Sequence, residues 1–212
     1  MKITQIKPIL TDRYLLVRVY TDKDIVGNGE AGYWEHHRTT AEHIRSLSEY
    51  FVGKDPRTIE HHHQTISRNT HFSGIALSAA LSAIDIALWD ILGKSVGLPV
   101  YQLLGGKCRD KIRVFENVGG DTIEARAESA KRSVANGFTT LRTTPFFGDF
   151  EKRESTANVT QAIEIVAAIR DAIGFEIDLG VEIHRNLQTD EAITLAKALQ
   201  PYRLKYYEDP LP

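Results

Sequence analysis

The chain has 212 residues, of which 42% are hydrophobic and 25% charged, the composition of an ordinary soluble globular protein. Its net charge is −2 and its basic residues do not cluster, so nothing suggests a nucleic-acid or membrane partner. The single cysteine, Cys108, excludes an internal disulfide and fits a reducing compartment. The opening residues lack the continuous apolar core of a signal peptide, so we expect a cytoplasmic protein.

Residues 1–110 are predicted to form an α+β domain. An antiparallel meander is indicated by strand-like runs with polar turns over residues 3–11, 15–21 and 25–32. Helices follow, and the strongest helical pattern covers residues 73–93, where small residues permit close packing. Asp85 and Asp90 interrupt its apolar run, which favours a buried helix over a membrane span.

From residue 111 onward, strand and helix patterns alternate strictly. Strands are expected over residues 111–117, 138–144, 175–183 and 204–209, with helices over 122–136, 159–173 and 189–200. This order implies a parallel sheet with right-handed crossovers. An α+β domain followed by four such strands predicts a capping domain (1–110) and the first four strands of a (β/α)8 barrel (111–212). Since a closed barrel takes about 250 residues, the alternatives are an open four-stranded sheet or the front part of a longer protein, and we favour the second.

Acidic side chains stand where two neighbouring strands of this sheet are expected to end. Glu182 ends the third strand and Glu208 ends the fourth, and His184 follows two residues after Glu182. The carboxyl ends of parallel strands form the usual ligand-binding edge, and carboxylates suit a hard divalent cation. On an extended strand, residues 182 and 184 point to the same side, so His184 is expected to face the same site. Alternatively, both glutamates merely begin solvated loops.

Several stretches, weak singly but specific in this order, resemble the enolase superfamily. They are MKITQIKPIL, VRVYTDKDIVGNGE, LSAIDIALWDILGKSVGLPVYQLLGG, RDKIRVFENVGGD and ALQPYRLKYYEDP. They look most like the mandelate racemase/muconate lactonizing enzyme branch, and within it the galactonate dehydratase-like acid-sugar dehydratases. The resemblance implies a modified TIM barrel that binds one Mg²⁺ through carboxylates after strands 3, 4 and 5. Glu182 stands where the family usually has aspartate, Glu208 matches its usual glutamate, and the third ligand lies beyond residue 212.

The resemblance also implies a reaction, the dehydration of a sugar acid to a 2-keto-3-deoxy acid by a carbon–oxygen lyase. His184 would be the general acid that protonates the leaving β-hydroxyl. Arg142 and Thr144 replace the Lys-x-Lys pair of the family's racemases, and because arginine stays protonated a lysine-based racemase is disfavoured. Arg142 would instead hold the substrate carboxylate or the enediolate oxygen as an electrostatic clamp. The alternative is that it pairs with neighbouring barrel carboxylates. The base would be a histidine outside this chain.

Other functions remain open, namely a racemase, epimerase or cycloisomerase of the same superfamily, or an inactive fragment or non-catalytic module. We expect the 212-residue chain alone to be inactive and the full-length protein to be a homo-oligomer acting on a small sugar-acid carboxylate. By resemblance, two capping-domain loops would contact the polyol tail through Tyr33, Trp34, His37, Arg38, His71 and Phe72. The run His61-His62-His63 is predicted to be a solvated helix face, because three consecutive helical residues cannot converge on one ion.

Overall fold

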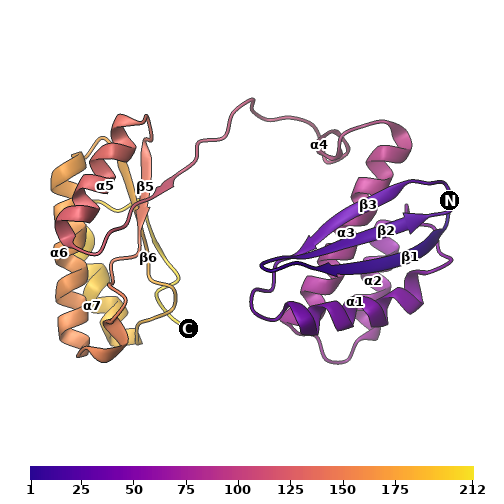
Figure 1. The fold of residues 1–212 in the computed structure, drawn as a ribbon, viewed down its shortest axis with the longest axis horizontal. Coiled ribbons are helices and arrows are strands. Elements are labelled where there is room, and N and C mark those ends of the chain that lie inside the picture. Colours follow the sequence, from indigo (N-terminus) through magenta and orange to yellow (C-terminus); the bar gives the residue numbers. More distant parts are fainter. The chain divides into compact units, whose positions relative to one another are not determined.

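The chain opens with the predicted antiparallel meander, formed by β1 (Ile3–Leu10), β2 (Leu15–Thr21) and β3 (Val26–Ala31) in the order β1-β2-β3. The computed structural model describes residues 1–212 apart from the side chain of Glu151, and divides them into two units, Met1–Asp110 and Lys111–Pro212 (Figure 1). In β2 every second side chain is buried, as a half-covered sheet requires, so one face of the meander carries the core.

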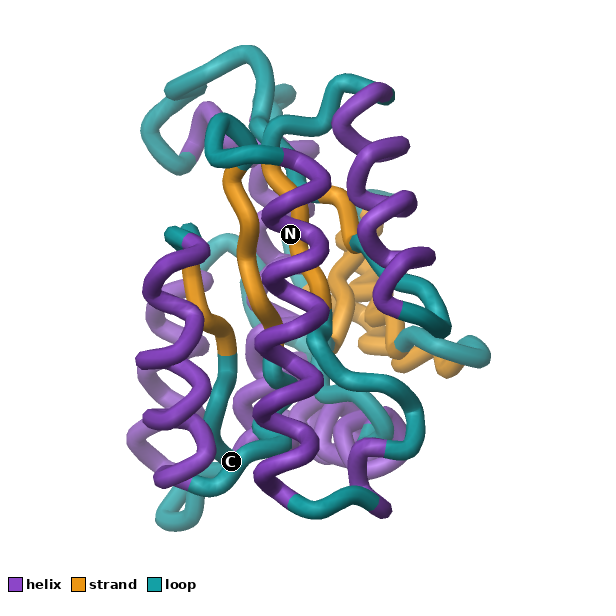
Figure 2. The backbone as a smooth tube through the Cα atoms, turned by 90° about the vertical axis from the view of Figure 1, so that its left-hand side faces the viewer, coloured by secondary structure: helices purple, strands orange, loops and turns teal.

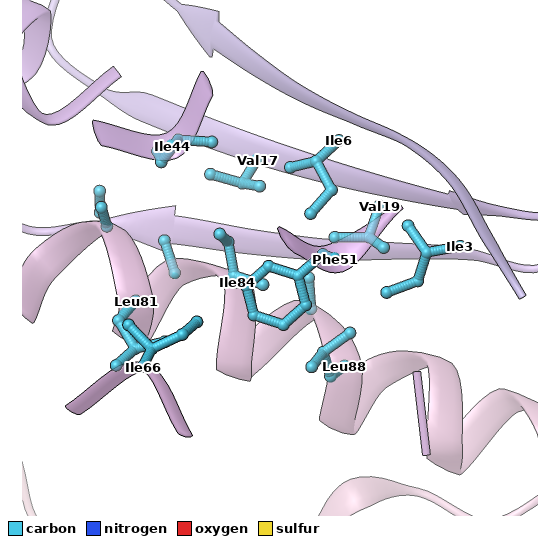
Figure 3. Close-up of a cluster of buried hydrophobic side chains, with 14 of the residues drawn as sticks. Ile3, Ile6, Val17, Val19, Ile44, Phe51, Ile66, Leu81, Ile84 and Leu88 are labelled. Carbon is cyan, nitrogen blue, oxygen red and sulfur yellow. The ribbon is translucent and has the colours of Figure 1, made fainter. Parts of the chain in front are cut away.

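Four helices complete the first unit: α1 (His37–Phe51), α2 (Ile59–Asn69), α3 (Ile75–Val96) and α4 (Val100–Leu103). Figure 3 shows side chains from the strands, among them Val17 and Val19, together with Ile84 and Leu88 of α3 in one buried cluster. By length and composition α3 could cross a membrane. In the structure it is instead the central core helix of this unit, because its small and aliphatic residues pack against the sheet.

The approach of α3 to β3 leaves no room for side chains at two glycines. A β-carbon on Gly27 would lie 2.1 Å from the Ala87 carbonyl oxygen, and one on Gly29 would lie 2.0 Å from that of Ala83. Such distances are far inside van der Waals contact, so the backbones of helix and strand can approach this closely only if both positions lack a β-carbon.

Side chains of α3 also satisfy the free edge of β3. Asp90 accepts the Asn28 backbone N–H at 2.8 Å, and Lys94 Nζ donates to the Val26 carbonyl oxygen at 2.7 Å. Asp90 and Lys94 are themselves paired at 2.7 Å. These contacts occupy edge groups that would otherwise be available to a foreign strand.

The second unit is a four-stranded parallel sheet in the order β4-β5-β6-β7, with three helices on one face (Figure 2). In chain order its elements are β4 (Glu116–Asn117), α5 (Ile123–Ala135), β5 (Thr140–Thr143), η1 (Phe150–Lys152), α6 (Ser155–Ile173), β6 (Asp178–Glu182), α7 (Thr189–Leu199), η2 (Gln200–Tyr202) and β7 (Tyr206–Glu208). The strands are shorter than predicted. Residues 111–115 in particular precede the first paired residue of β4 and are not strand.

The two faces of this sheet differ in character. Leu141, Leu179 and Val181 point toward the helices and are fully buried in the second core. Because side chains alternate along a strand, the neighbouring residues Arg142 and Glu182 lie on the opposite face. The polar residues of the candidate site therefore share the face that α5, α6 and α7 do not cover.

The prediction that residues 61–63 form a solvated helix face is wrong for His62. His61 and His63 are exposed, but His62 is only 2% exposed, because it packs against Phe51 and Tyr50. Its Nδ1 lies 3.1 Å from the Tyr50 hydroxyl, and its Nε2 lies 2.8 Å from the Asp55 carbonyl oxygen. The three rings do not converge on one ion, as expected, and His62 is a core residue with both ring nitrogens satisfied.

Replacing Gly29 by alanine should destabilise the first unit by about 1–3 kcal/mol, because the added methyl group must push α3 away from β3. Urea unfolding followed by circular dichroism would measure the change in midpoint. Gly32→Ala is the matched control, since a β-carbon there meets nothing within 4 Å. Equal midpoints for Gly29→Ala and wild type would contradict the close approach.

His62 should make stability depend on pH. Burial lowers the pKa of His62 below its ordinary value of 6.5, so the unfolded chain takes up a proton more readily than the folded one. The free energy of unfolding should therefore fall as pH drops from 6.5 through the lowered folded pKa, and this contribution should be constant well above 6.5. His62→Gln should flatten the pH profile measured by urea unfolding, whereas the exposed control His63→Gln should not. A profile that keeps its slope in His62→Gln would refute this role.

Candidate metal and substrate site

Two carboxylates lie side by side at the carboxyl edge of the parallel sheet. Glu182 is the last residue of β6 and Glu208 the last of β7, and the two are directly paired in the register. Glu182 is 4% exposed, whereas the Glu208 side chain is 40% exposed. The structure therefore brings together the two acidic residues selected from the sequence, one buried and one open to solvent.

Arg142 of β5 lies between these carboxylates. Its Nη1 is 3.3 Å from Glu182 Oε2 and 3.3 Å from Glu208 Oε2. Its Nε donates to Asn117 Oδ1 at 2.9 Å, and its guanidinium lies over the Phe115 ring at 4.7 Å. Of the two readings of Arg142 that the sequence allows, the structure shows the pairing with neighbouring carboxylates.

His184 reaches the site by a turn and not by an extended strand. The expectation of an extended backbone is wrong, because β6 ends at Glu182 and both His184 and Arg185 have positive φ, 55° and 61°. Non-glycine residues rarely adopt this conformation, so the surrounding contacts must hold the turn. The His184 N–H donates to Glu182 Oε1 at 2.7 Å, and its Nδ1 lies 3.4 Å from Thr144 Oγ1.

Backbone hydrogen bonds join the ends of β6 and β7 beyond their last paired residues. The Ile183 N–H donates to the Glu208 carbonyl oxygen at 3.0 Å, and the Arg185 N–H to that of Asp209 at 2.6 Å. Asp209 also has a positive φ, 41°. The two turns that follow the carboxylates are thus held to each other, which keeps His184 on the side of the site.

A pocket of about 360 Å³ adjoins Arg142 on the side of β4. Its lining includes Arg142, Asn117, Thr144, His184 and a second arginine, Arg126, and no acidic side chain among those that the structure describes. Two guanidinium groups and a histidine without a carboxylate among them make this pocket suited to an anionic ligand.

Arg126 shapes this pocket from within the protein. It is buried, and it donates to the carbonyl oxygens of Gly120 at 2.9 Å, Phe146 at 2.7 Å and Thr144. These carbonyls belong to the loops that follow β4 and β5. Arg126 therefore holds together the two loops on that side of the pocket. Its position on a predicted helix gave no indication of this role.

Tyr206 lies on the same face, below the carboxylates. Its ring covers Gly180, where a β-carbon would be 2.1 Å from Tyr206 Cζ. Burial, and then the charge of Glu208, raise the pKa of the Tyr206 hydroxyl. This hydroxyl has no hydrogen-bond partner among the residues that the structure describes. The sequence reasoning missed Tyr206 and Asn117, although Asn117 ends the expected first strand and the rule that selected Glu182 would have included it.

The donor set fits a divalent cation such as Mg²⁺. Among the described side chains no group of three or more His, Cys, Asp or Glu could hold a metal. Two carboxylates that face a common point do occur, however, and a positive charge from Arg142 already lies there. Mg²⁺ is commonly held by one or two carboxylates with water and substrate oxygens completing its shell, so two protein ligands are compatible with binding.

The candidate substrate-contacting residues of the capping domain lie in the first unit. Trp34 and Phe72 are strongly exposed. His37 and Arg38 belong to the first turn of α1 and not to a loop as expected. Trp34 and His37 line a pocket of about 360 Å³. Tyr33 stacks on His36 at 4.4 Å, and His71 is an exposed loop residue.

Comparison with known proteins gives matches over nearly the whole chain. Residues 3–105 match the family model for the mandelate racemase/muconate lactonizing enzyme N-terminal domain, and residues 125–212 match the enolase C-terminal domain-like model. A D-galactonate dehydratase of Pectobacterium atrosepticum is 37% identical over 216 residues, which cover all of this chain and 56% of that protein. The chain thus spans little more than half the length of this curated relative.

Solved structures give the same result. A putative dehydratase from Mesorhizobium loti is 33% identical with a TM-score of 0.89, covering all of this chain and 60% of that one. An enolase from Pantoea ananatis with bound d-gluconate and Mg is 28% identical with a TM-score of 0.91, again covering all of this chain and 60% of that one. The chain therefore belongs to the enolase superfamily, in its mandelate racemase/muconate lactonizing enzyme group.

Proposed function

We propose that this chain supplies the capping domain and the first four barrel strands of a Mg²⁺-dependent acid-sugar dehydratase. The observation that carries the proposal is the pair Glu182 and Glu208, held at one edge of a parallel sheet with Arg142 between them. The relatives named D-galactonate dehydratase support the reaction class, and the related structure with d-gluconate and Mg supports both ligand and metal. The product would be a 2-keto-3-deoxy acid.

Each site residue then has a chemical role. Glu182 and Glu208 would hold the cation, which when bound would polarise the substrate carboxylate and make the adjacent C–H more acidic. Arg142 would bind the anionic end of the substrate in the adjoining pocket. His184, at the edge of the same pocket, would give its proton to the leaving hydroxyl. The third metal ligand and the base would come from outside residues 1–212.

The six residues of the first unit would contact the polyol. Trp34 and Phe72 offer exposed aromatic surface, while His37 and Arg38 offer hydrogen-bond donors for hydroxyl groups. A protein from the complete reading frame that forms no 2-keto-3-deoxy acid from a panel of hexonates and pentonates would refute the proposed reaction. Exchange of the α-hydrogen with solvent without loss of water would favour a racemase or epimerase instead.

Removing either carboxylate should weaken metal binding. Glu182→Gln and Glu208→Gln should each lower Mn²⁺ affinity by at least about tenfold, because each removes a negatively charged oxygen ligand. Electron paramagnetic resonance titration with Mn²⁺ would measure this. Glu176→Gln, which removes an exposed carboxylate before β6, is the matched control and should bind as wild type does. Wild-type affinity in either site variant would contradict the assignment of that glutamate as a ligand.

Loss of His184 should slow the loss of water without stopping the removal of the α-hydrogen. His184→Asn should lower the dehydration rate by about 10²–10⁴-fold, the usual contribution of a general acid, while α-hydrogen exchange with D₂O continues. Asparagine tolerates positive φ, so the turn at this position is preserved. Product formation and exchange would be followed together by proton NMR. Equal loss of both activities would assign His184 to the first step or to structure.

A further inference from the structure

Arg142 contacts the two carboxylates in an unusual way. A single nitrogen, Nη1, is 3.3 Å from an oxygen of each glutamate, slightly beyond the usual range for N–H···O hydrogen bonds. A side chain dedicated to one glutamate would instead form a shorter bidentate pair. Arg142 thus places its positive charge at a point that Glu182 and Glu208 share, where a bound cation would make the same contacts.

Other contacts would keep Arg142 at the site without the carboxylates. Its Nε donates to Asn117 Oδ1 at 2.9 Å, and its guanidinium lies over the Phe115 ring at 4.7 Å. The pocket with Asn117, Thr144 and His184 in its lining opens beside it. These contacts and the adjoining pocket give the guanidinium a polar place to occupy when it leaves both glutamates.

The net charge around Glu182 and Glu208 determines whether Arg142 lies between them or in the adjoining pocket. With no metal, two carboxylates and one guanidinium give the cluster a net charge of about −1, and Arg142 is attracted to the glutamates. A divalent cation at the same oxygens adds two positive charges next to the guanidinium, whatever the third ligand is, and so repels it. Arg142 is then no longer attracted to the glutamates, and an anion in the pocket becomes its most favourable partner.

We propose that Arg142 is an internal substitute for the divalent cation. Without metal it neutralises Glu182 and Glu208; when metal binds, it leaves them and becomes the anion-binding group of the adjoining pocket. The inference rests on the proposed metal role of the two glutamates. It adds an order of binding, in which the metal binds before the substrate carboxylate. It also explains why an arginine is tolerated beside a metal site: its charge is needed in both states.

The test is Mn²⁺ affinity in Arg142→Gln, measured by electron paramagnetic resonance on protein from the complete reading frame. The variant should bind Mn²⁺ about 5- to 20-fold more tightly than wild type, because the competing charge is gone. Arg142→Lys should stay within about twofold of wild type, since it keeps the charge. Arg185→Gln is the matched control, because this exposed arginine on the next loop is paired with Asp209 and with neither glutamate among the described contacts, so its loss should have no effect.

Thermal melting gives a second readout. Without divalent metal, Arg142→Gln should melt below wild type, because two adjacent carboxylates lose their cation, and saturating Mg²⁺ should remove most of the difference. Unchanged or weaker Mn²⁺ binding in Arg142→Gln, with binding lost in Glu182→Gln, would overturn the substitute role and leave the proposed function standing. Unchanged binding in Glu182→Gln would overturn both.

Discussion

Two parallel strands that end in register place like charges next to each other, and this constraint dominates the second unit. Glu182 and Glu208 are paired neighbours, and Glu182 is nearly excluded from solvent. A carboxylate in such a place needs a compensating charge, since burial of an unpaired charge is costly. Arg142 from the next strand provides it, and its own position depends on Asn117 of the strand beyond. The four strands thus form one electrostatic unit.

Packing of the sheet decides which residues can take part. The helices cover one face with aliphatic side chains, so the period-two alternation sends the polar partners to the other face. Tyr206 can lie flat on that face only because Gly180 opposite it has no side chain. Its ring takes the place that a side chain at Gly180 would occupy, on the face that also carries Glu208 and Arg142.

The sequence was informative where a repeating pattern carries the structure. Strict strand–helix alternation predicts the parallel sheet, and strand ends in a parallel sheet predict that residues 182 and 208 meet. Features that depend on one residue and its particular neighbours could not be predicted from the sequence. The positive φ at His184 has no periodic signal, the burial of His62 depends on Phe51 and Tyr50 from another helix, and the loop-tying role of Arg126 depends on carbonyls up to 20 residues away. The capping-loop assignments rest on resemblance and stay predictions.

In the proposed metal site, the hydrogen bond from the His184 N–H to Glu182 Oε1 has a consequence for metal selectivity. One oxygen of this carboxylate orients the turn that carries the histidine, so only the other faces the cation position freely. Mg²⁺ accepts single-oxygen ligation, whereas Ca²⁺ often takes both oxygens of a carboxylate. A calcium ion that did so would compete with the His184 amide for Oε1. The larger ion would then fill the proposed site while the turn loses the bond that orients His184, the proposed acid.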